Sequence, residues 1–120
     1  MSLHGLRILV VEDEAFVALM VEDMLVDLGA RVVGPASTLA RGLALAAAEV
    51  LDAAVLDVNV RGEPITPLAD VLRQCGVPMV FATGYGEAPE GQHQDMPVLE
   101  KPYTRDDLHK AVAAALGTRE

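Results

Sequence analysis

The stretch Leu-Arg-Ile-Leu-Val-Val-Glu-Asp, residues 6–13, decides how this chain folds. Its apolar part, residues 6–11, predicts a buried strand that stops at Glu12 and Asp13. Residues 53–56, Ala-Ala-Val-Leu, predict a second buried strand, which stops at Asp57. Two buried strands of a parallel sheet that end in acid bring their carboxylates to one edge of that sheet.

Carboxylates gathered in this way repel each other. At ~5 Å and an effective dielectric constant of ~20, each pair costs roughly 3 kcal/mol. A cation among the acids would offset that cost, and Mg²⁺ is the natural candidate because its ligands are carboxylate, carbonyl and water oxygens. The sequence therefore predicts an Mg²⁺ site around Glu12, Asp13 and Asp57.

The composition narrows the class of protein. The chain has 120 residues, a formal charge of −9 and 52% hydrophobic residues, which predicts one domain over residues 1–120. The acidic balance argues against binding to nucleic acid or to anionic lipid. Cys75 is the single cysteine, so no internal disulfide is expected. No apolar run has the length of a membrane span and no signal peptide is evident, so we expect a cytoplasmic location.

Strand and helix patterns alternate along the chain. Further strands are expected at residues 31–34, 78–82 and 97–100, and Pro35 is expected to end the first of these. Helices are expected over residues 14–28, after a cap at Ser37 or Thr38, after Pro64 or Pro67, and from a capping box at Thr104 and Asp107. The expected apolar faces of these helices are, in chain order, Val17, Met20, Val21, Met24 and Leu28; Leu39, Leu43, Ala46, Ala47 and Val50; Leu68, Val71, Leu72 and Cys75; and Leu108, Ala111, Val112, Ala115 and Leu116.

Two segments break the regular alternation. Residues 58–63 are expected to form a loop, and residues 84–95, rich in glycine and poor in apolar residues, a short, poorly packed or mobile helix. His4, His93 and His109 have no metal-ligand spacing and are interpreted as surface residues.

Five strands alternating with helices predict an α/β domain whose parallel sheet is covered on both faces. Ligands in such folds bind at the carboxyl ends of the strands. Thr83 follows the strand at residues 78–82 and Lys101 follows the strand at residues 97–100, so both join the acids at that edge.

Four motifs together resemble a response-regulator receiver domain of bacterial two-component signalling. They are Val-Val-Glu-Asp-Glu at residues 10–14, Leu-Asp-Val-Asn at 56–59, Phe-Ala-Thr-Gly at 81–84 and Lys-Pro at 101–102, and the resemblance spans residues 6–116. It implies a flavodoxin-like (βα)5 three-layer sandwich with the strand order 2-1-3-4-5. The stretch at residues 81–85 is similar to the Phe-Ala-Thr-Gly (FATGUY) subgroup, whose members are often stand-alone and pair with HWE-type histidine kinases.

The resemblance implies a metal site. Asp13 and Asp57 would bind Mg²⁺ directly together with the backbone carbonyl of Asn59, and Glu12 would hold it through water. Alone, Glu12 and Asp13 could simply cap a helix, and Asp57 and Asn59 could be turn residues. To replace the metal site, separate explanations of this kind would all have to hold at several strand ends at once.

The resemblance also implies the roles around the phosphoryl group. Asp57 would accept it from a phosphohistidine, Lys101 would pair with Asp57 and then with a phosphoryl oxygen, and Thr83 would donate its hydroxyl to another. Gly84 would leave room for the phosphodonor, and Lys101-Pro102 would be a cis peptide. Alone, Thr83 is typical of a strand and Lys101 of a solvated surface.

One position departs from the family. Receivers usually carry Tyr or Phe three residues before the active-site lysine, and here that position is Val98. The Phe-Ala-Thr-Gly subgroup shares this absence. The signal is therefore expected to travel through residues 84–95, which phosphorylation would order.

Three functions compete at this stage. The first is a stand-alone receiver that signals by phosphorylation-dependent binding to an unidentified protein, with a sensor histidine kinase as donor and a weak dimer through its last helix as an option. The second is a phosphate sink or shuttle in a phosphorelay. The third is a phosphatase of the haloacid-dehalogenase type, which would need an aspartate where Asn59 stands. Apart from self-phosphorylation and autodephosphorylation at Asp57, we expect no enzyme activity.

Overall fold

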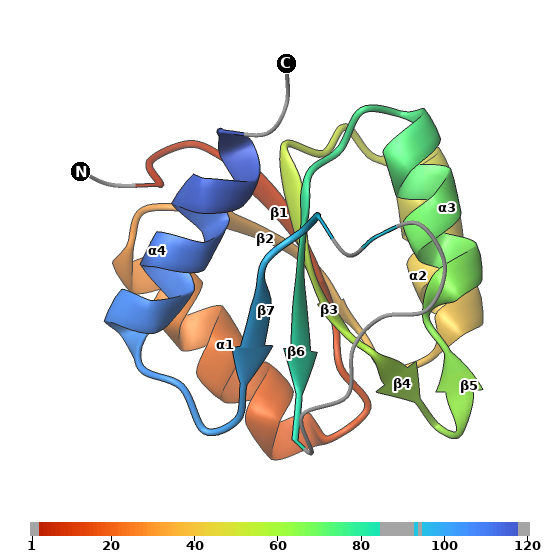
Figure 1. Ribbon diagram of the computed structural model, residues 1–120, viewed down its shortest axis with the longest axis horizontal. Coiled ribbons are helices and arrows are strands. Elements are labelled where there is room, and N and C mark those ends of the chain that lie inside the picture. Colours follow the sequence, from red (N-terminus) through yellow and green to blue (C-terminus); the bar gives the residue numbers. More distant parts are fainter. Residues whose placement is uncertain (1–2, 85–92, 94, 118–120) are drawn as a thin grey trace.

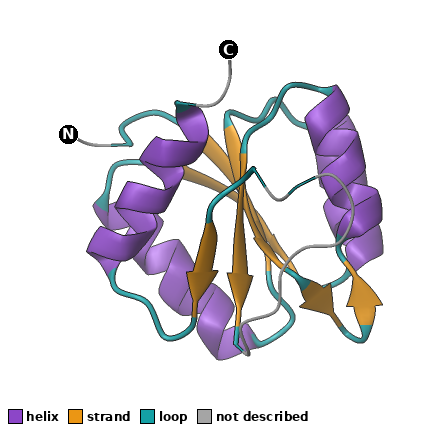
Figure 2. Ribbon diagram, in the orientation of Figure 1, coloured by secondary structure: helices purple, strands orange, loops and turns teal. Residues whose placement is uncertain are grey.

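A five-stranded parallel sheet forms the middle layer of the protein (Figures 1 and 2). The computed structural model describes residues 3–84, 93 and 95–117. The strands are β1 (Arg7–Val11), β2 (Arg31–Ala36), β3 (Ala53–Asp57), β6 (Met79–Thr83) and β7 (Val98–Glu100). Their order in the sheet is β2-β1-β3-β6-β7. When only the strands of this sheet are numbered along the chain, the order is 2-1-3-4-5. The predicted α/β, flavodoxin-like fold class and strand order are therefore confirmed.

Two helices cover each face of the sheet. Helices α1 (Ala15–Asp27) and α4 (Arg105–Leu116) lie on one face, and α2 (Leu39–Ala48) and α3 (Thr66–Gln74) lie on the other (Figure 1). Successive side chains of β1 pack on opposite faces of the sheet. Ile8 and Val10 pack in the core under α1 and α4, and Leu9 and Val11 pack in the core under α2 and α3. This is why a central strand must be apolar along its whole length.

Strand β2 continues past its expected end. Pro35 was expected to end it, but the strand runs to Ala36 and pairs there with Val11. The expectation was wrong because β2 is an edge strand, where a proline without an N–H costs no ladder hydrogen bond. Gly34 before it has φ +97 and the sheet register shifts between Leu9 and Val11, which marks a bulge.

The predicted starts and ends of the helices largely hold. Thr38 caps α2 by accepting a hydrogen bond from the backbone N–H of Arg41, and Thr104 and Asp107 form the predicted capping box of α4. Gly29, with φ +90, follows the end of α1 as expected. The apolar face predicted for α4 is confirmed, because its first four members are buried and the fifth packs against them.

The apolar faces predicted for the other helices are only partly right. In α1 the fully buried residues are Ala18, Val21 and Leu25, in α2 only Gly42 is fully buried, and in α3 they are Leu68, Ala69 and Leu72. The residues expected on buried faces but exposed are Met20, Ala47, Val50, Val71 and Cys75. Helix α1 is apolar nearly all round, so its sequence pattern could not select the face that packs.

Residues 58–63, expected as a loop, form part of a small hairpin. It consists of β4 (Asn59–Val60) and β5 (Glu63–Pro64), which pair antiparallel. Most of the expected helix at residues 84–95 lies outside the described residues.

His93 contradicts its interpretation as a surface residue. It is 1% exposed and packs against the Phe81 ring, with centroids 6.2 Å apart. Its Nδ1 accepts a hydrogen bond from Arg73 Nε (3.1 Å), so its Nε2–H donates to Asp70 Oδ1 (2.6 Å). The partners on α3 satisfy both ring nitrogens, which is what allows a histidine to be buried.

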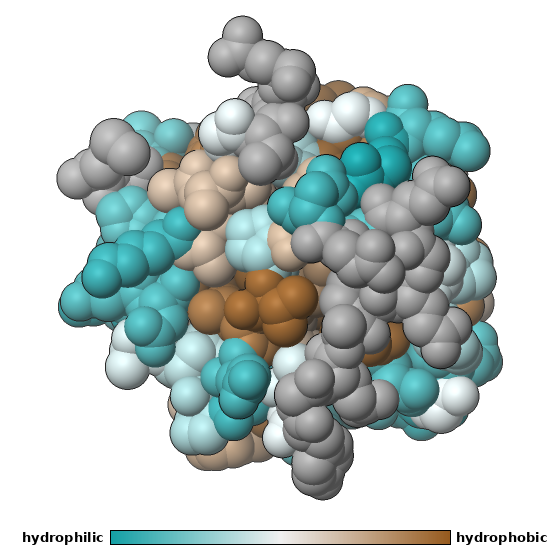
Figure 3. All heavy atoms as spheres, in the orientation of Figure 1, coloured by the Kyte–Doolittle hydropathy of each residue, from teal (hydrophilic) through white to brown (hydrophobic). Residues whose placement is uncertain are grey.

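The surface of the sheet edge at β7 is apolar in part. Figure 3 shows apolar atoms gathered over this strand, beside α4. Val98, at the position where receivers usually carry an aromatic ring, is 44% exposed there. Among the described residues, no helix is both long enough and apolar enough to cross a membrane.

Candidate functional site

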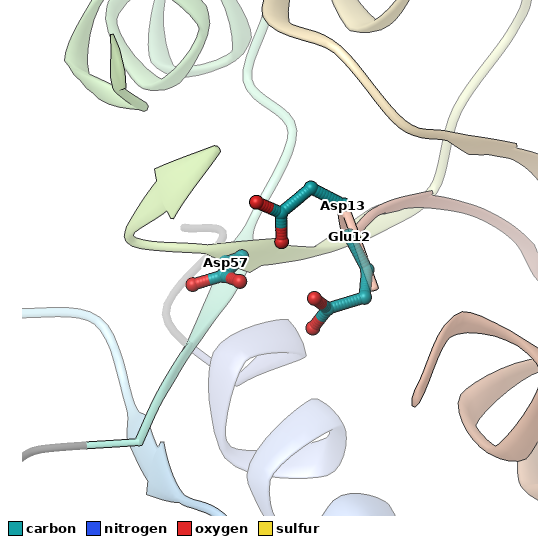
Figure 4. Close-up of side chains that lie close together, drawn as sticks. All are labelled: Glu12, Asp13 and Asp57. Carbon is teal, nitrogen blue, oxygen red and sulfur yellow. The ribbon is translucent and has the colours of Figure 1, made fainter. Parts of the chain in front are cut away.

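Three carboxylates meet at the carboxyl-terminal edge of the sheet. Glu12 and Asp13 directly follow β1, and Asp57 is the last residue of β3, the neighbouring strand. Figure 4 shows their side chains turned toward a common space. One oxygen from each lies within 4.8 Å of the others. The structure thus places the predicted acids together, as parallel pairing of β1 and β3 requires.

Lys101 lies among these acids. It follows β7, and its Nζ lies 2.6 Å from Glu12 Oε1 and 3.2 Å from Asp57 Oδ2. The side chain is only 18% exposed, so water screens these ion pairs weakly. The pairing with Asp57 was expected from the resemblance to receivers, whereas the shorter contact with Glu12 was not.

Burial controls the charge of Glu12. The residue is 4% exposed, and loss of hydration raises its pKa to about 7, although Lys101 and the backbone N–H of Glu14 oppose the rise. Burial on its own would lower the pKa of Lys101, but the contacts with Glu12 and Asp57 outweigh it and raise that pKa. Near neutral pH the lysine is therefore charged, while Glu12, with its pKa raised to about 7, is partly protonated.

The hairpin after β3 contacts Asp13. The backbone N–H of Arg61 donates to Asp13 Oδ2 (2.9 Å), and this hydrogen bond is the main reason that the pKa of Asp13 is lowered. The backbone N–H of Asn59 points to Asp57 Oδ1 at 3.4 Å. Sequence reasoning missed Arg61, since a backbone donor leaves no signature in residue type.

The other predicted residues lie at the same edge. Thr83, the last residue of β6, is buried, and its carbonyl accepts a hydrogen bond from the backbone N–H of Lys101 (2.8 Å). Among the described residues, leaving out its chain neighbours, a Cβ placed on Gly84 would meet no atom within 4 Å. The peptide bond between Lys101 and Pro102 is cis, as the resemblance implied.

A groove of about 640 Å³ opens beside the acids. Its polar end is formed by Asp13, Asp57 and Lys101. Its apolar wall is formed by residues of α1, including Met20, and by Tyr103. Burial raises the pKa of Tyr103 to about 12, so its hydroxyl stays protonated. The groove therefore reaches Asp57 along the side of α1.

The fold and the site together define an α/β domain with an acidic, lysine-containing pocket at the ends of parallel strands. No family model and no curated protein matches the chain. Solved structures do. SdrG from Sphingomonas melonis Fr1, in solution, is 45% identical, with 97% of this chain and 99% of SdrG covered and a TM-score of 0.85.

Two further structures agree. The BeF3-activated conformation of SdrG, from Pseudomonas melonis Fr1, is 44% identical, covers 93% of this chain and 98% of SdrG, and has a TM-score of 0.78. A response regulator receiver protein from Sinorhizobium medicae WSM419 is 28% identical, with 99% and 100% of the two chains covered and a TM-score of 0.82. This chain therefore belongs to the response-regulator receiver domains, which are signalling proteins of two-component systems rather than enzymes in the usual sense.

Proposed function

We propose that this chain is a stand-alone receiver domain, spanning residues 1–120, that accepts a phosphoryl group on Asp57 from the phosphohistidine of a histidine kinase. The observation that carries the proposal is the ion pair between Asp57 and Lys101 inside the acidic cluster. A carboxylate at a strand end, beside an open groove, can act as a nucleophile toward phosphorus.

Phosphoryl transfer at this site can be written with the residues in place. An Asp57 oxygen attacks phosphorus, a P–O bond forms as the P–N bond to the donor histidine breaks, and the electron pair of that bond returns to the imidazole. Lys101 then moves its charge from the carboxylate to a phosphoryl oxygen. Thr83 donates its hydroxyl to another oxygen, and Gly84, which carries no side chain, leaves room for the donor.

The donor set suits Mg²⁺. All the candidate ligands are oxygens, and ligands at ~2.1 Å from Mg²⁺ lie up to about 4.2 Å apart, so the observed separation within 4.8 Å needs only small rotations or a bridging water. Asp13 and Asp57 would bind the ion directly and Glu12 through water. When bound, the ion neutralises negative charge on the phosphoryl oxygens.

The hairpin supports the backbone carbonyl of Asn59 as a further ligand. Ile65 N–H donates to the carbonyl of Val58 (2.9 Å), so the next pair, Asn59 and Pro64, is the kind that exchanges no hydrogen bonds. The backbone groups of Asn59 therefore point away from β5, and its N–H already points to Asp57. Its carbonyl leaves the strand on that same side.

The first experiment is phosphorylation with acetyl phosphate, followed by intact mass. We expect one phosphoryl adduct that requires Mg²⁺ and is absent in Asp57→Asn, while the control Asp106→Asn, at an exposed position of α4, is labelled like the wild type. An adduct that persists in Asp57→Asn, or no adduct at all with Mg²⁺ present, would contradict the proposal.

We place the kinase, by the subgroup resemblance one of the HWE type, on the groove beside α1. The apolar wall continues onto exposed side chains of α1, including Phe16, which is 74% exposed. A helix that carries the donor histidine could lay its apolar face there. We expect Met20→Gln to slow transfer from such a kinase and to leave labelling by acetyl phosphate unchanged. Equal loss with both donors would point instead to damage at Asp57.

Phosphorylation-dependent binding of a downstream protein is the proposed output. The similar protein SdrG has a BeF3-activated conformation, and BeF3 bound to a carboxylate mimics a phosphoryl group. With an exposed Val98 in place of an aromatic ring, the route of the signal is proposed to run through residues 84–95, most of which lie outside the described residues. Unchanged amide exchange over residues 84–96 after phosphorylation would refute this route.

A further inference from the structure

We propose that Arg61 is a positioning residue for the acidic site, which fixes Asp13 through its backbone N–H while its guanidinium anchors the hairpin to the loop after β2. The proposal rests on the Mg²⁺ site described above and adds to it a residue outside the expected ligand set.

The hairpin turn is unusual at Arg61. Arg61 and Gly62 occupy the two central positions between β4 and β5, and both have positive φ, +52 and +80. Hairpin turns of this kind favour Asn-Gly, because a side chain other than Asn, Asp or Gly disfavours the left-handed region. Arg61 is the only non-glycine residue with positive φ in the part of the chain that the structure describes. Positive φ at a residue other than glycine costs free energy, so this backbone conformation must be stabilised by other contacts.

Two hydrogen bonds supply those contacts. The Arg61 N–H donates to Asp13 Oδ2 (2.9 Å), and its Nε donates to the carbonyl of Ser37 (3.0 Å). Asp13 follows β1 and Ser37 follows β2, so one residue ties together the loops after three strands. The Arg61 side chain anchors the hairpin to the Ser37 carbonyl, and the anchored hairpin keeps the Arg61 N–H directed at Asp13.

The consequence for the site is geometric. The hydrogen bond from Arg61 to Oδ2 of Asp13 restricts rotation of this carboxylate, one oxygen of which lies within 4.8 Å of oxygens of Glu12 and Asp57. The same hairpin carries Asn59, whose N–H points to Asp57. Groups that orient metal ligands in this way typically change metal affinity 10- to 100-fold when they are removed.

A charge effect and a positioning effect of Arg61 would change the Mg²⁺ affinity in opposite directions, so one measurement separates them. Removing a cation next to an acidic cluster raises the affinity for Mg²⁺ if Arg61 acts only through its charge. If Arg61 acts by positioning, its removal lowers that affinity.

The experiment measures Mg²⁺ binding by isothermal titration calorimetry. Arg61→Asn keeps the turn, since Asn-Gly is the preferred pair there, but it cannot reach Ser37. We expect the Kd for Mg²⁺ to rise about tenfold. Arg31→Asn, a charge-matched control at the opposite end of the sheet, should change the Kd less than about twofold, as expected of an exposed charge at a distance. Arg61→Gly, which adopts positive φ without strain, should weaken binding as Arg61→Asn does.

Each outcome decides one question. Tighter or unchanged binding in both Arg61 variants would overturn the positioning role. Failure of the wild type to bind millimolar Mg²⁺ would instead defeat the proposed metal site.

Discussion

Glu12→Gln should stabilise the metal-free protein at neutral and alkaline pH. Glu12 is buried beside Asp57, and burial raises its pKa from 4.5 to about 7 in the folded state. Between these two values the folded protein binds a proton that the unfolded chain has released. Stability therefore falls as the pH rises through this window, and it is not affected below it.

The structure sets the size of the effect. Moving one pKa from 4.5 to about 7 corresponds to about 3 kcal/mol, because each pH unit is worth about 1.4 kcal/mol. Gln keeps the shape and an oxygen that accepts from Lys101 at 2.6 Å, but it loses the attraction of opposite charges. Hence we expect a net gain of about 1–3 kcal/mol above pH 7.5 and little gain at pH 4.5.

Urea unfolding followed by far-UV circular dichroism, with EDTA present, measures this gain, since the chain has no tryptophan for fluorescence. Glu63→Gln, an exposed residue of β5, serves as the matched control. Mg²⁺ at about ten times its Kd should stabilise the wild type by about 1.4 kcal/mol at pH 7.5. If wild type and Glu12→Gln lose stability in parallel between pH 5 and 7, the reasoning about Glu12 is refuted.

Three further substitutions test packing against α2, the hydrogen bonds of a buried histidine and the cap of α4. Gly42→Ala places a Cβ 2.9 Å from buried Leu68, so overpacking should exceed the gain in helix propensity and lower stability by about 1 kcal/mol, and a higher melting temperature would contradict this. His93→Leu removes both ring hydrogen bonds and should cost about 1–3 kcal/mol in urea unfolding, whereas a neutral result would mean that His93 is not held as described. Thr104→Ala removes the cap of α4 and should cost about 1 kcal/mol, in contrast to a Ser37→Ala control at an exposed position before α2; equal effects would refute the capping contribution.

The alternation of elements and the strand ends were predictable because both are local properties. A run such as Ile8–Val11 is buried wherever it pairs, and the acids that follow it must lie at the carboxyl end of the strand. Once β1 and β3 pair in parallel, Asp13 and Asp57 come together with no further information.

The face that α1 buries could not be predicted, because its sequence offers apolar residues on every side and only the sheet selects among them. The prediction for His93 was wrong for a related reason. A histidine is polar by type, and it is buried here because Asp70 and Arg73, about 20 residues earlier in the chain, satisfy its ring.

By itself, the sequence determined the order of strands and helices, the acids at two strand ends, the phosphoacceptor candidate Asp57 and the resemblance to receivers. These depend on residue type and spacing. Only the tertiary structure decided that Lys101, 89 residues from Glu12, lies closer to that acid than to Asp57, and that a turn at Arg61 holds Asp13. Both contacts join segments whose distance in space is set by packing of the whole sheet, which no local pattern encodes.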